Sequence, residues 1–243
     1  MPETLTLSPA EPSVETRSAS LIETSSHPDS PLTMVHQVCC ICGVSDEDVV
    51  GVGEDFEYRT TNDTHIAVQC RRCGLVYQDP RPDEAELSRI YPSDYHAFQF
   101  QAESFGFVCR VRQRLKAGRL KRWMKGLPHD ARILDVGCGD GFHLKLLRDH
   151  GQKTWTLEGL DADQRAVDAA TDGGLNVQLG RVEDNSLAAD AYDFVIMIMT
   201  IEHVANPIES LAAVQRVLKP GGRLVVITDN TQTLHHRLFK GRH

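Results

Sequence analysis

The sequence predicts an α/β protein in which a doubly wound parallel sheet follows a small cysteine-rich module. From residue 128 onward, short apolar strands alternate with helices, which implies a parallel sheet covered by helices on both faces. A glycine-rich turn follows the first of these strands, and two Cys-x-x-Cys pairs lie upstream. The domains we expect are a disordered tail (1–35), a zinc-binding module (36–77), a helical connector or cap (78–127) and the sheet domain (128–243).

The tail and the connector are justified by composition. The tail is rich in Pro, Ser, Thr and Glu and has too few large apolar residues to form a core. Within the connector, residues 105–125 have helical periodicity with Val108, Val111, Leu115 and Trp123 on one side. Eight of the sixteen residues from Arg110 to Lys125 are basic, which indicates either a solvated helix face or contact with an anionic substrate or partner.

The sheet domain contains five apolar runs that we expect to form strands. Residues 142–151 and a segment starting near 207 have the pattern of amphipathic helices between those runs. The strands are expected near residues 132–136, 155–160, 175–179, 192–198 and 222–228.

Composition excludes several classes of protein. The chain has 243 residues, 41% of them hydrophobic, and a formal net charge of -8, which makes nucleic acid an unlikely partner. No apolar run is long enough to span a membrane and no export signal is present, so we expect a cytoplasmic protein. In that setting the seven cysteines are metal ligands or free thiols rather than disulfides.

The turn "LDVGCGDG", residues 134–141, is expected to bind a ligand rather than only to reverse the chain. Its glycines permit close approach of backbone to a ligand at the start of a helix. The dinucleotide fingerprint G-x-G-x-x-G is not matched, because Phe142 stands where the third glycine is required. The Lys and Ser or Thr of a P-loop are also missing. An acid ends the first strand, Asp135, and another, Asp161, ends the second, close to the interval at which a carboxylate meets a ribose diol.

The ordered motifs "ILDVGCGDG", "GLDAD", "GRVED", "YDFVIMIMTIEHV" and "VLKPGGRLVV" resemble those of class I S-adenosylmethionine-dependent methyltransferases. The resemblance covers about residues 128–230 and implies a Rossmann-like sheet and S-adenosylmethionine as cofactor. It implies that the first acid and the glycine turn hold the methionine part of the cofactor and that the second acid binds the ribose, with Glu158 a less favoured alternative. Val182 would contact the adenine, and either Glu183 or Asp184 would bind its amine. The cofactor residues are then Asp135, Gly137, Gly139, Gly141, Asp161, Val182, Glu183 and Asp184.

A candidate general base follows the fourth strand. His203 lies at the strand end, where open α/β sheets place their ligands, and its ordinary pKa suits proton abstraction. The alternative is that it caps or packs a helix start, with Glu202 only orienting it. His143 is a weaker candidate, and Tyr91 and Tyr95 either close over the cofactor or acceptor or pack in the core.

The cysteines are expected to bind a structural zinc ion. "CCICG" and "CRRCG" are two Cys-x-x-Cys-Gly knuckles separated by 27 residues, and four thiolates from two such turns can surround zinc tetrahedrally. A closed four-cysteine site leaves no position for a substrate. The expected ligands are Cys39, Cys42, Cys70 and Cys73, and the cysteines outside the site are Cys40, Cys109 and Cys138.

The order of zinc knuckles, tyrosine-rich segment and sheet domain resembles bacterial enzymes that methylate sugars or other small molecules. It implies a small-molecule acceptor, with anionic ones among the candidates, such as a sugar or nucleotide-linked sugar methylated at carbon or oxygen. Two alternatives remain open: an RNA methyltransferase, and a truncated, non-catalytic protein that binds the cofactor or a partner. The family's last two strands are expected to be absent, which would leave a sheet edge open to a protein partner or to self-association.

Overall fold

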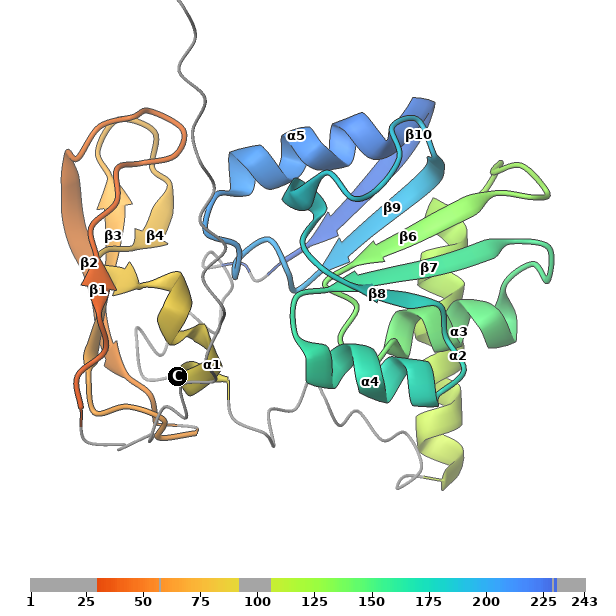
Figure 1. The fold of residues 1–243 in the computed structure, drawn as a ribbon, viewed down its shortest axis with the longest axis horizontal. Coiled ribbons are helices and arrows are strands. Elements are labelled where there is room, and N and C mark those ends of the chain that lie inside the picture. The colour runs from red at the N-terminus through yellow and green to blue at the C-terminus, as the bar shows by residue number, and fades with distance from the viewer. Residues whose placement is uncertain (1–29, 57, 92–105, 229, 231–243) are drawn as a thin grey trace, which may run out of the picture.

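A computed structural model describes residues 30–56, 58–91, 106–228 and 230 (Figure 1). Its main feature is a five-stranded parallel sheet in the order β10-β9-β6-β7-β8, so the first strand of the domain lies in the middle. This confirms the doubly wound, Rossmann-like fold. The strands are β6 (Arg132–Val136), β7 (Thr156–Asp161), β8 (Val177–Leu179), β9 (Tyr192–Ile198) and β10 (Leu218–Ile227).

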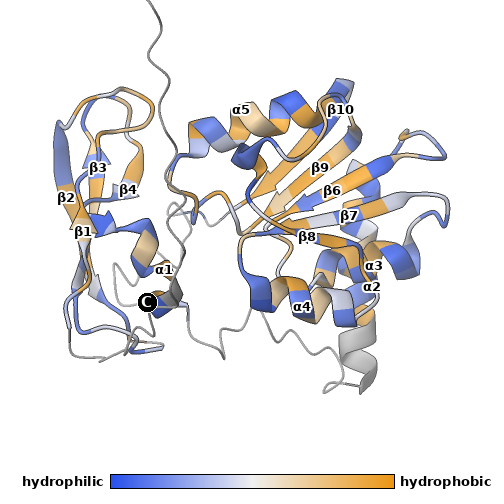
Figure 2. Ribbon diagram, viewed as in Figure 1, coloured by the Kyte–Doolittle hydropathy of each residue, from blue (hydrophilic) through white to orange (hydrophobic). Residues whose placement is uncertain are grey.

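Helices cover both faces of this sheet because its central strands are apolar on both sides. Ile133 packs with α2 and α3 on one face, while the next residue, Leu134, packs with α5 on the other. Figure 2 shows the resulting apolar strands between helices whose outer surfaces are polar. The helices are α2 (Gly106–Trp123), α3 (Phe142–His150), α4 (Gln164–Asp172), the short 3₁₀ turn η4 (Val182–Asp184) and α5 (Pro207–Val217).

The cysteine-rich module is built on a three-stranded antiparallel sheet in the order β2-β3-β4, beside a short β1–β5 pair. Because β1 pairs with β5, ordered elements extend beyond the expected range 36–77 at both ends. The module's elements are β1 (Met34–Val35), β2 (Glu47–Glu54), β3 (Thr64–Cys70), β4 (Val76–Gln78), β5 (Arg81–Pro82), the 3₁₀ turn η1 (Glu84–Glu86) and α1 (Leu87–Ile90).

Residues 83–91, here called the bridging segment, connect this module to the sheet domain. On the module side, the backbone N–H of Asp83 donates to the carbonyl of Thr33 at 2.8 Å. On the sheet side, Glu84 forms an ion pair with Arg181, which follows β8. In Figure 1 the strand arrows of the parallel sheet end on the side that faces α1. The bridging segment therefore lies at the carboxyl ends of the strands.

The expected apolar side of the 105–125 helix is partly wrong. Val111 is 39% exposed and Leu115 is 71% exposed, whereas Ala117, Leu120 and Met124 are buried against the sheet. The buried positions follow helical spacing, but they form a different side of the helix from the predicted one, and it is this side that packs against the sheet. The side chain of Val108 lies outside the described residues.

Other expectations concern the N-terminal tail, the edge of the parallel sheet and the lack of a membrane span. Most of the expected tail, as well as Tyr95 and the side chain of Cys109, falls outside the described residues. Among the described strands, β10 pairs only with β9, so its other side is an edge of the described sheet. None of the described helices is long and apolar enough to cross a membrane.

Candidate functional site

The glycine turn between β6 and α3 is shaped by backbone contacts that side chains would block. Gly137, Gly139 and Gly141 have φ angles of +68°, +54° and +78°, a region that L side chains rarely adopt. A Cβ atom on Gly137 would lie 2.6 Å from Oγ1 of Thr200, whose hydroxyl donates to the carbonyl of Val136 at 3.1 Å. Thr200 thus braces the turn from the end of β9, a role that its sequence position did not reveal.

Asp135 is a buried carboxylate beside this turn. Its residue is 1% exposed, and its Oδ2 atom has no hydrogen-bond partner among the described residues. Burial, with a smaller contribution from the charge of Asp161, raises the pKa of Asp135 well above its ordinary value. His143 lies nearby, with Nδ1 at 3.9 Å from Oδ2. A buried polar atom without a partner is costly, so a ligand group that bonds to it would be favoured.

Asp161 lies across the turn from Asp135 at the end of β7. Its Oδ2 accepts a hydrogen bond from the backbone N–H of Gly139 at 2.8 Å, and its Oδ1 accepts one from that of Asp163 at 3.0 Å. Burial raises the pKa of Asp161 although these N–H groups act in the opposite direction. Both second-strand carboxylates were considered for the ribose, and only Asp161 lies against the turn.

Glu158 is held elsewhere in the fold. Its carboxylate accepts hydrogen bonds from Arg132 at 2.9 and 3.1 Å and from the hydroxyl of Tyr192 at 2.5 Å. The guanidinium of Arg132 also stacks over the ring of Tyr192. These contacts give Glu158 a structural role between β6, β7 and β9.

The segment after β8, which contains the motif "GRVED", forms the 3₁₀ turn η4. Val182 is buried in the core cluster under α5. Glu183 accepts a hydrogen bond from the hydroxyl of Ser210, while Asp184 accepts one from the backbone N–H of Arg181 at 2.7 Å and so caps the turn. Each of the two candidate carboxylates therefore already has one partner, and the structure does not decide between them.

His203 meets Tyr91 of the bridging segment at the same edge of the sheet. The Tyr91 hydroxyl and His203 Nδ1 are 2.9 Å apart, and the two rings are arranged edge to face. The carbonyl of Tyr91 accepts a hydrogen bond from Arg165 at 3.0 Å. Residues 112 positions apart in the chain are thus brought together, and no pattern in the sequence could pair them.

His143 is less suited to act as a base. It is largely buried beside α2, and burial, with a smaller effect of the nearby Lys116, lowers its pKa to about 4. A histidine with this pKa is neutral over the physiological range and a weak base. Its place next to Asp135 favours a role in shaping the site.

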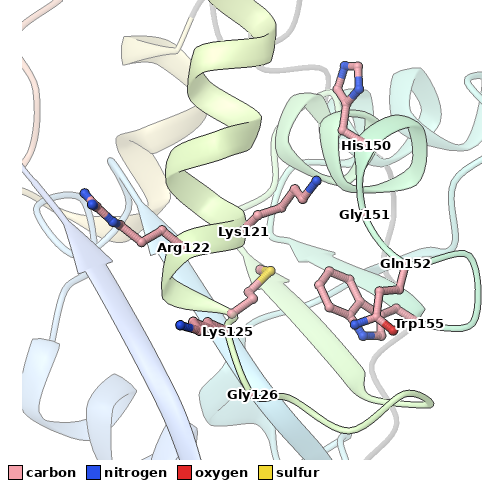
Figure 3. Close-up of a pocket in the computed structure, with 9 residues that line it drawn as sticks. Lys121, Arg122, Lys125, Gly126, His150, Gly151, Gln152 and Trp155 are labelled. Atoms are coloured by element: carbon pink, nitrogen blue, oxygen red, sulfur yellow. The ribbon is translucent and has the colours of Figure 1, made fainter.

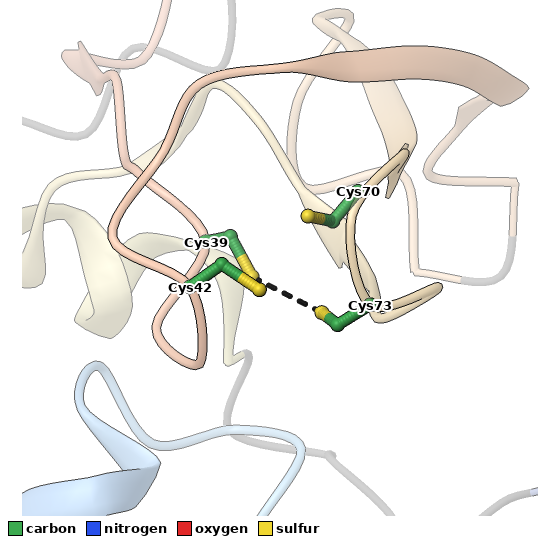
Figure 4. Close-up of side chains that lie close together, drawn as sticks. All are labelled: Cys39, Cys42, Cys70 and Cys73. Carbon is green, nitrogen blue, oxygen red and sulfur yellow. Dashed lines mark hydrogen bonds between the residues drawn. The ribbon is translucent and has the colours of Figure 1, made fainter.

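The four expected cysteine ligands converge in the module (Figure 4). Their sulfur atoms all lie within 4.8 Å of one another, and those of Cys39 and Cys73 are 3.6 Å apart. Tetrahedral zinc with bonds of about 2.3 Å requires sulfur atoms about 3.8 Å apart. Burial alone would raise the pKa of Cys39, but N–H groups of Cys42 and Ile41 and the neighbouring thiols lower it to about 7.

The two knuckles have the same backbone geometry. The N–H of Gly43 donates to the carbonyl of Cys39 at 2.7 Å, and that of Gly74 donates to Cys70 at 2.8 Å. Both glycines have positive φ angles. Thiolate donors at this spacing fit zinc, and the four cysteines can bind it. Cys40 is exposed and Cys138 is buried in the glycine turn, away from this cluster.

The residues at the carboxyl edge also fit S-adenosylmethionine. An unpartnered buried carboxylate oxygen and a second acid on the adjacent strand offer hydrogen-bond acceptors to its methionine and ribose parts, and the turn that is closed to side chains offers the space. Sequence comparison agrees with this chemistry. The family described as "Methyltransferase domain" matches residues 101–242.

Individual relatives match part of the chain. A "Ubiquinone biosynthesis O-methyltransferase" from Roseobacter denitrificans is 35% identical over 105 residues, which are 41% of this chain and 41% of the relative. An uncharacterized protein of a Streptomyces fradiae transposon is 35% identical over 98 residues, covering 38% of this chain and 28% of that protein. This chain thus spans well under half the length of these relatives.

Solved structures match part of the chain. A protein from Pyrococcus horikoshii has a TM-score of 0.48 and 23% identity, covering 63% of this chain and 66% of that one. A SAM-dependent methyltransferase from Aquifex aeolicus has a TM-score of 0.43 and 22% identity, covering 63% and 76%. The family match extends over more than half of the chain, including every strand of the parallel sheet. The chain therefore belongs to the methyltransferase-domain family, and the expected class I S-adenosylmethionine-dependent methyltransferase fold is confirmed.

Proposed function

We propose that this protein transfers a methyl group from S-adenosylmethionine to a small-molecule acceptor held at the carboxyl edge of the parallel sheet. The observation that carries the proposal is the unpartnered Oδ2 atom of Asp135 beside the glycine turn. Because a buried polar atom without a partner is costly, this carboxylate favours the binding of a cationic or hydrogen-donating ligand group. The methionine part of the cofactor provides an ammonium group of that kind.

The chain's own residues would bind and orient the cofactor. Asp135 would hold the methionine part together with Gly137, Gly139 and Gly141, whose backbone leaves room for it. Asp161 would accept hydrogen bonds from the ribose hydroxyls, and Val182 would contact the adenine, with Glu183 or Asp184 on its amine. When bound, the sulfonium of the cofactor supplies an activated methyl group, and the enzyme's task is mainly to align the acceptor.

His203 would take the proton from the acceptor. In a neutral histidine only one ring nitrogen carries hydrogen. If Nδ1–H donates to the Tyr91 oxygen, Nε2 is left with a lone pair and can act as a base. In the opposite tautomer the Tyr91 hydroxyl donates to Nδ1, so the basic nitrogen is occupied by Tyr91 and Nε2 carries the hydrogen. Tyr91 would therefore orient the ring and, by accepting the hydrogen bond of Nδ1–H, would leave Nε2 as the base.

The acceptor is proposed to be a small molecule with an acidic hydroxyl or carbon. The name of the O-methyltransferase relative supports transfer to oxygen of a small molecule. A sugar or nucleotide-linked sugar remains our first proposal for the acceptor. Its phosphates would meet only the first half of α2, where Arg114 is exposed, because the cations at the other end of this helix lie at the far edge of the sheet.

The cysteine cluster is proposed to bind a structural zinc ion that holds the module together. By fixing the module, the zinc ion would also hold the bridging segment in place, including Tyr91, which contacts His203. Zinc would therefore support catalysis by positioning, without contact with the substrate.

A transfer assay with a panel of acceptors tests the function. Zinc-loaded chain would be incubated with S-adenosylmethionine labelled in the methyl group and with nucleotide-linked sugars, free sugars and phenols in separate reactions. We expect labelled product with one acceptor class and a loss of about 100-fold or more in His203→Gln, since a positioned base contributes that much. If S-adenosylmethionine binds but no small molecule is labelled, while RNA is, the RNA methyltransferase alternative replaces this proposal.

A further inference from the structure

A second concave site lies at the opposite edge of the parallel sheet from the cofactor residues. It has a volume of about 450 Å³, within the range of small-molecule pockets. It lies beside the residues that precede β6 and β7, whereas Asp135 and Asp161 are near the other ends of these strands. A five-residue strand such as β6 is roughly 16 Å long, so the two sites are separate. Residues that line it include Lys121, Met124, Lys125, His150 and Trp155.

The rim of this pocket is positively charged. Lys121 and Lys125 are exposed at the end of α2, and His150 ends α3. In Figure 3, Lys121 extends from α2 toward the side of the pocket formed by His150 and Trp155. Within the part of the chain that the structure describes, no carboxylate forms an ion pair with either lysine. Lys121 thus brings to the cavity an ammonium group that has no carboxylate partner among the described residues, and Lys125 lines the cavity from the end of the same helix, in a protein with a net charge of -8.

The wall of the pocket is aromatic and fixed in place. The indole N–H of Trp155 donates to the carbonyl of Pro128 at 3.2 Å. A Cβ atom on Gly151 would lie 3.1 Å from two ring carbons, so the backbone packs directly on the indole. The ring also packs against the core cluster that includes Met124, so it is fixed in place at the wall of the pocket.

Stabilisation of the helix ends alone does not account for Lys121 and Lys125. Cations near a helix C-terminus are favoured by the helix dipole. However, the end of α3 already has Lys153, whose ammonium donates to the carbonyl of Arg148 at 2.6 Å, and the end of α2 also carries Arg122. Lys121 and Lys125 add charge beside a fixed aromatic ring, a combination suited to phosphate groups attached to a flat base.

We propose that this pocket is a second binding site that takes the phosphates and the aromatic base of a nucleotide, which is either a free nucleoside diphosphate or part of a single-stranded RNA. The lysines would bind the phosphates, and the base would lie against Trp155. The site is independent of methyl transfer, because none of its residues belongs to the cofactor edge.

Trp155 provides a direct readout. The chain contains two tryptophans, so a Trp123→Phe variant has Trp155 as its single indole. In that background we would titrate uridine diphosphate and an oligouridylate separately and follow Trp155 emission. A Lys121→Ala/Lys125→Ala variant tests the charges, and Arg119→Ala is the matched control, since it removes an exposed cation of the same helix outside the pocket.

We expect a saturable change in emission, weakened about tenfold in the double lysine variant and unchanged in Arg119→Ala. Saturation by the diphosphate alone identifies a free nucleotide as the ligand, and much tighter binding of the oligouridylate identifies an RNA strand. Absence of any saturable change with both probes up to about 1 mM would overturn the proposal, as would equal affinity in the double lysine variant. Calorimetry with uridine diphosphate on the unaltered chain checks that Trp123→Phe itself did not create or remove the effect. S-adenosylhomocysteine binding by each variant reports separately on the cofactor edge.

Discussion

Replacing Asp135 by Asn should stabilise the protein while removing its affinity for S-adenosylmethionine. The carboxylate is 1% exposed, and its Oδ2 atom has no partner among the described residues. A buried charge without a partner costs several kcal/mol, whereas an unpartnered neutral amide costs about 1–3 kcal/mol. The amide has the same shape, so we expect the free energy of unfolding without cofactor to rise by about 1–3 kcal/mol at pH 7.5. For a domain of this size, that corresponds to a Tm increase of about 2–10 °C.

The stability gained by Asp135→Asn should depend on pH in a direction that can be measured. Because burial raises the pKa of Asp135, the folded state binds a proton more tightly than the unfolded state does. Stability from this group is therefore fully present below its unfolded pKa and is lost as the pH rises through the folded pKa. The advantage of Asp135→Asn should be large at pH 7.5 and should shrink toward pH 4.

The assay is thermal unfolding followed by circular dichroism, with and without saturating S-adenosylmethionine. The cofactor should raise the Tm of the natural chain and have no effect on Asp135→Asn. Asp193→Asn is the matched control, because this carboxylate accepts hydrogen bonds from Lys219 at 2.7 Å and from the backbone N–H of Arg132 at 2.8 Å. Its replacement should lower the Tm. The reasoning is refuted if Asp135→Asn is less stable than the natural chain at pH 7.5 and still binds the cofactor.

Three further changes test the turn, the zinc cluster and the base. Gly137→Ala would bring Cβ against Thr200 at a positive φ angle, so we expect the free energy of unfolding in urea to fall by about 1–3 kcal/mol. Adding Thr200→Ser should recover part of this loss, and an unchanged urea midpoint in Gly137→Ala would contradict the expectation. Cys73→Ser should remove bound zinc, measured by elemental analysis, and should lower methyl transfer more than cofactor binding; full activity without zinc would show that the module does not position the site. Tyr91→Phe should reduce kcat about tenfold or more and alter the pH profile of kcat, while leaving the Kd of the cofactor unchanged. A pH profile identical to that of the natural chain would exclude an effect of Tyr91 on His203.

The sheet was predictable from the sequence because its signals are local. Apolar runs such as 192–198 are buried on both faces, and a strand of that kind has few alternative positions in a parallel sheet. The glycine turn and the cysteine knuckles were equally predictable, because the spacing of their Gly and Cys residues is itself the pattern that indicates such turns. These features needed no knowledge of what lies far away in the chain.

Features that depend on contacts between distant segments were not predictable. Tyr91 meets His203 only because the bridging segment runs along the strand ends, and Thr200 braces Gly137 only because β9 lies next to β6. The error over Leu115 has the same origin: helical spacing defines several possible buried faces, and the distance to the sheet decides among them. The lysine-lined pocket likewise depends on how α2 meets α3.

Calorimetric titration with S-adenosylmethionine, comparing the natural chain with Asp161→Ala, tests the central claim most directly. Asp161 touches the glycine turn through Gly139, and its removal should leave the sheet folded. The account predicts one cofactor per chain, with affinity reduced about 100-fold or more in the variant, as expected for the loss of charge-assisted hydrogen bonds in a buried site. Equal affinity in the two proteins, or no binding by a folded natural chain, would contradict the account.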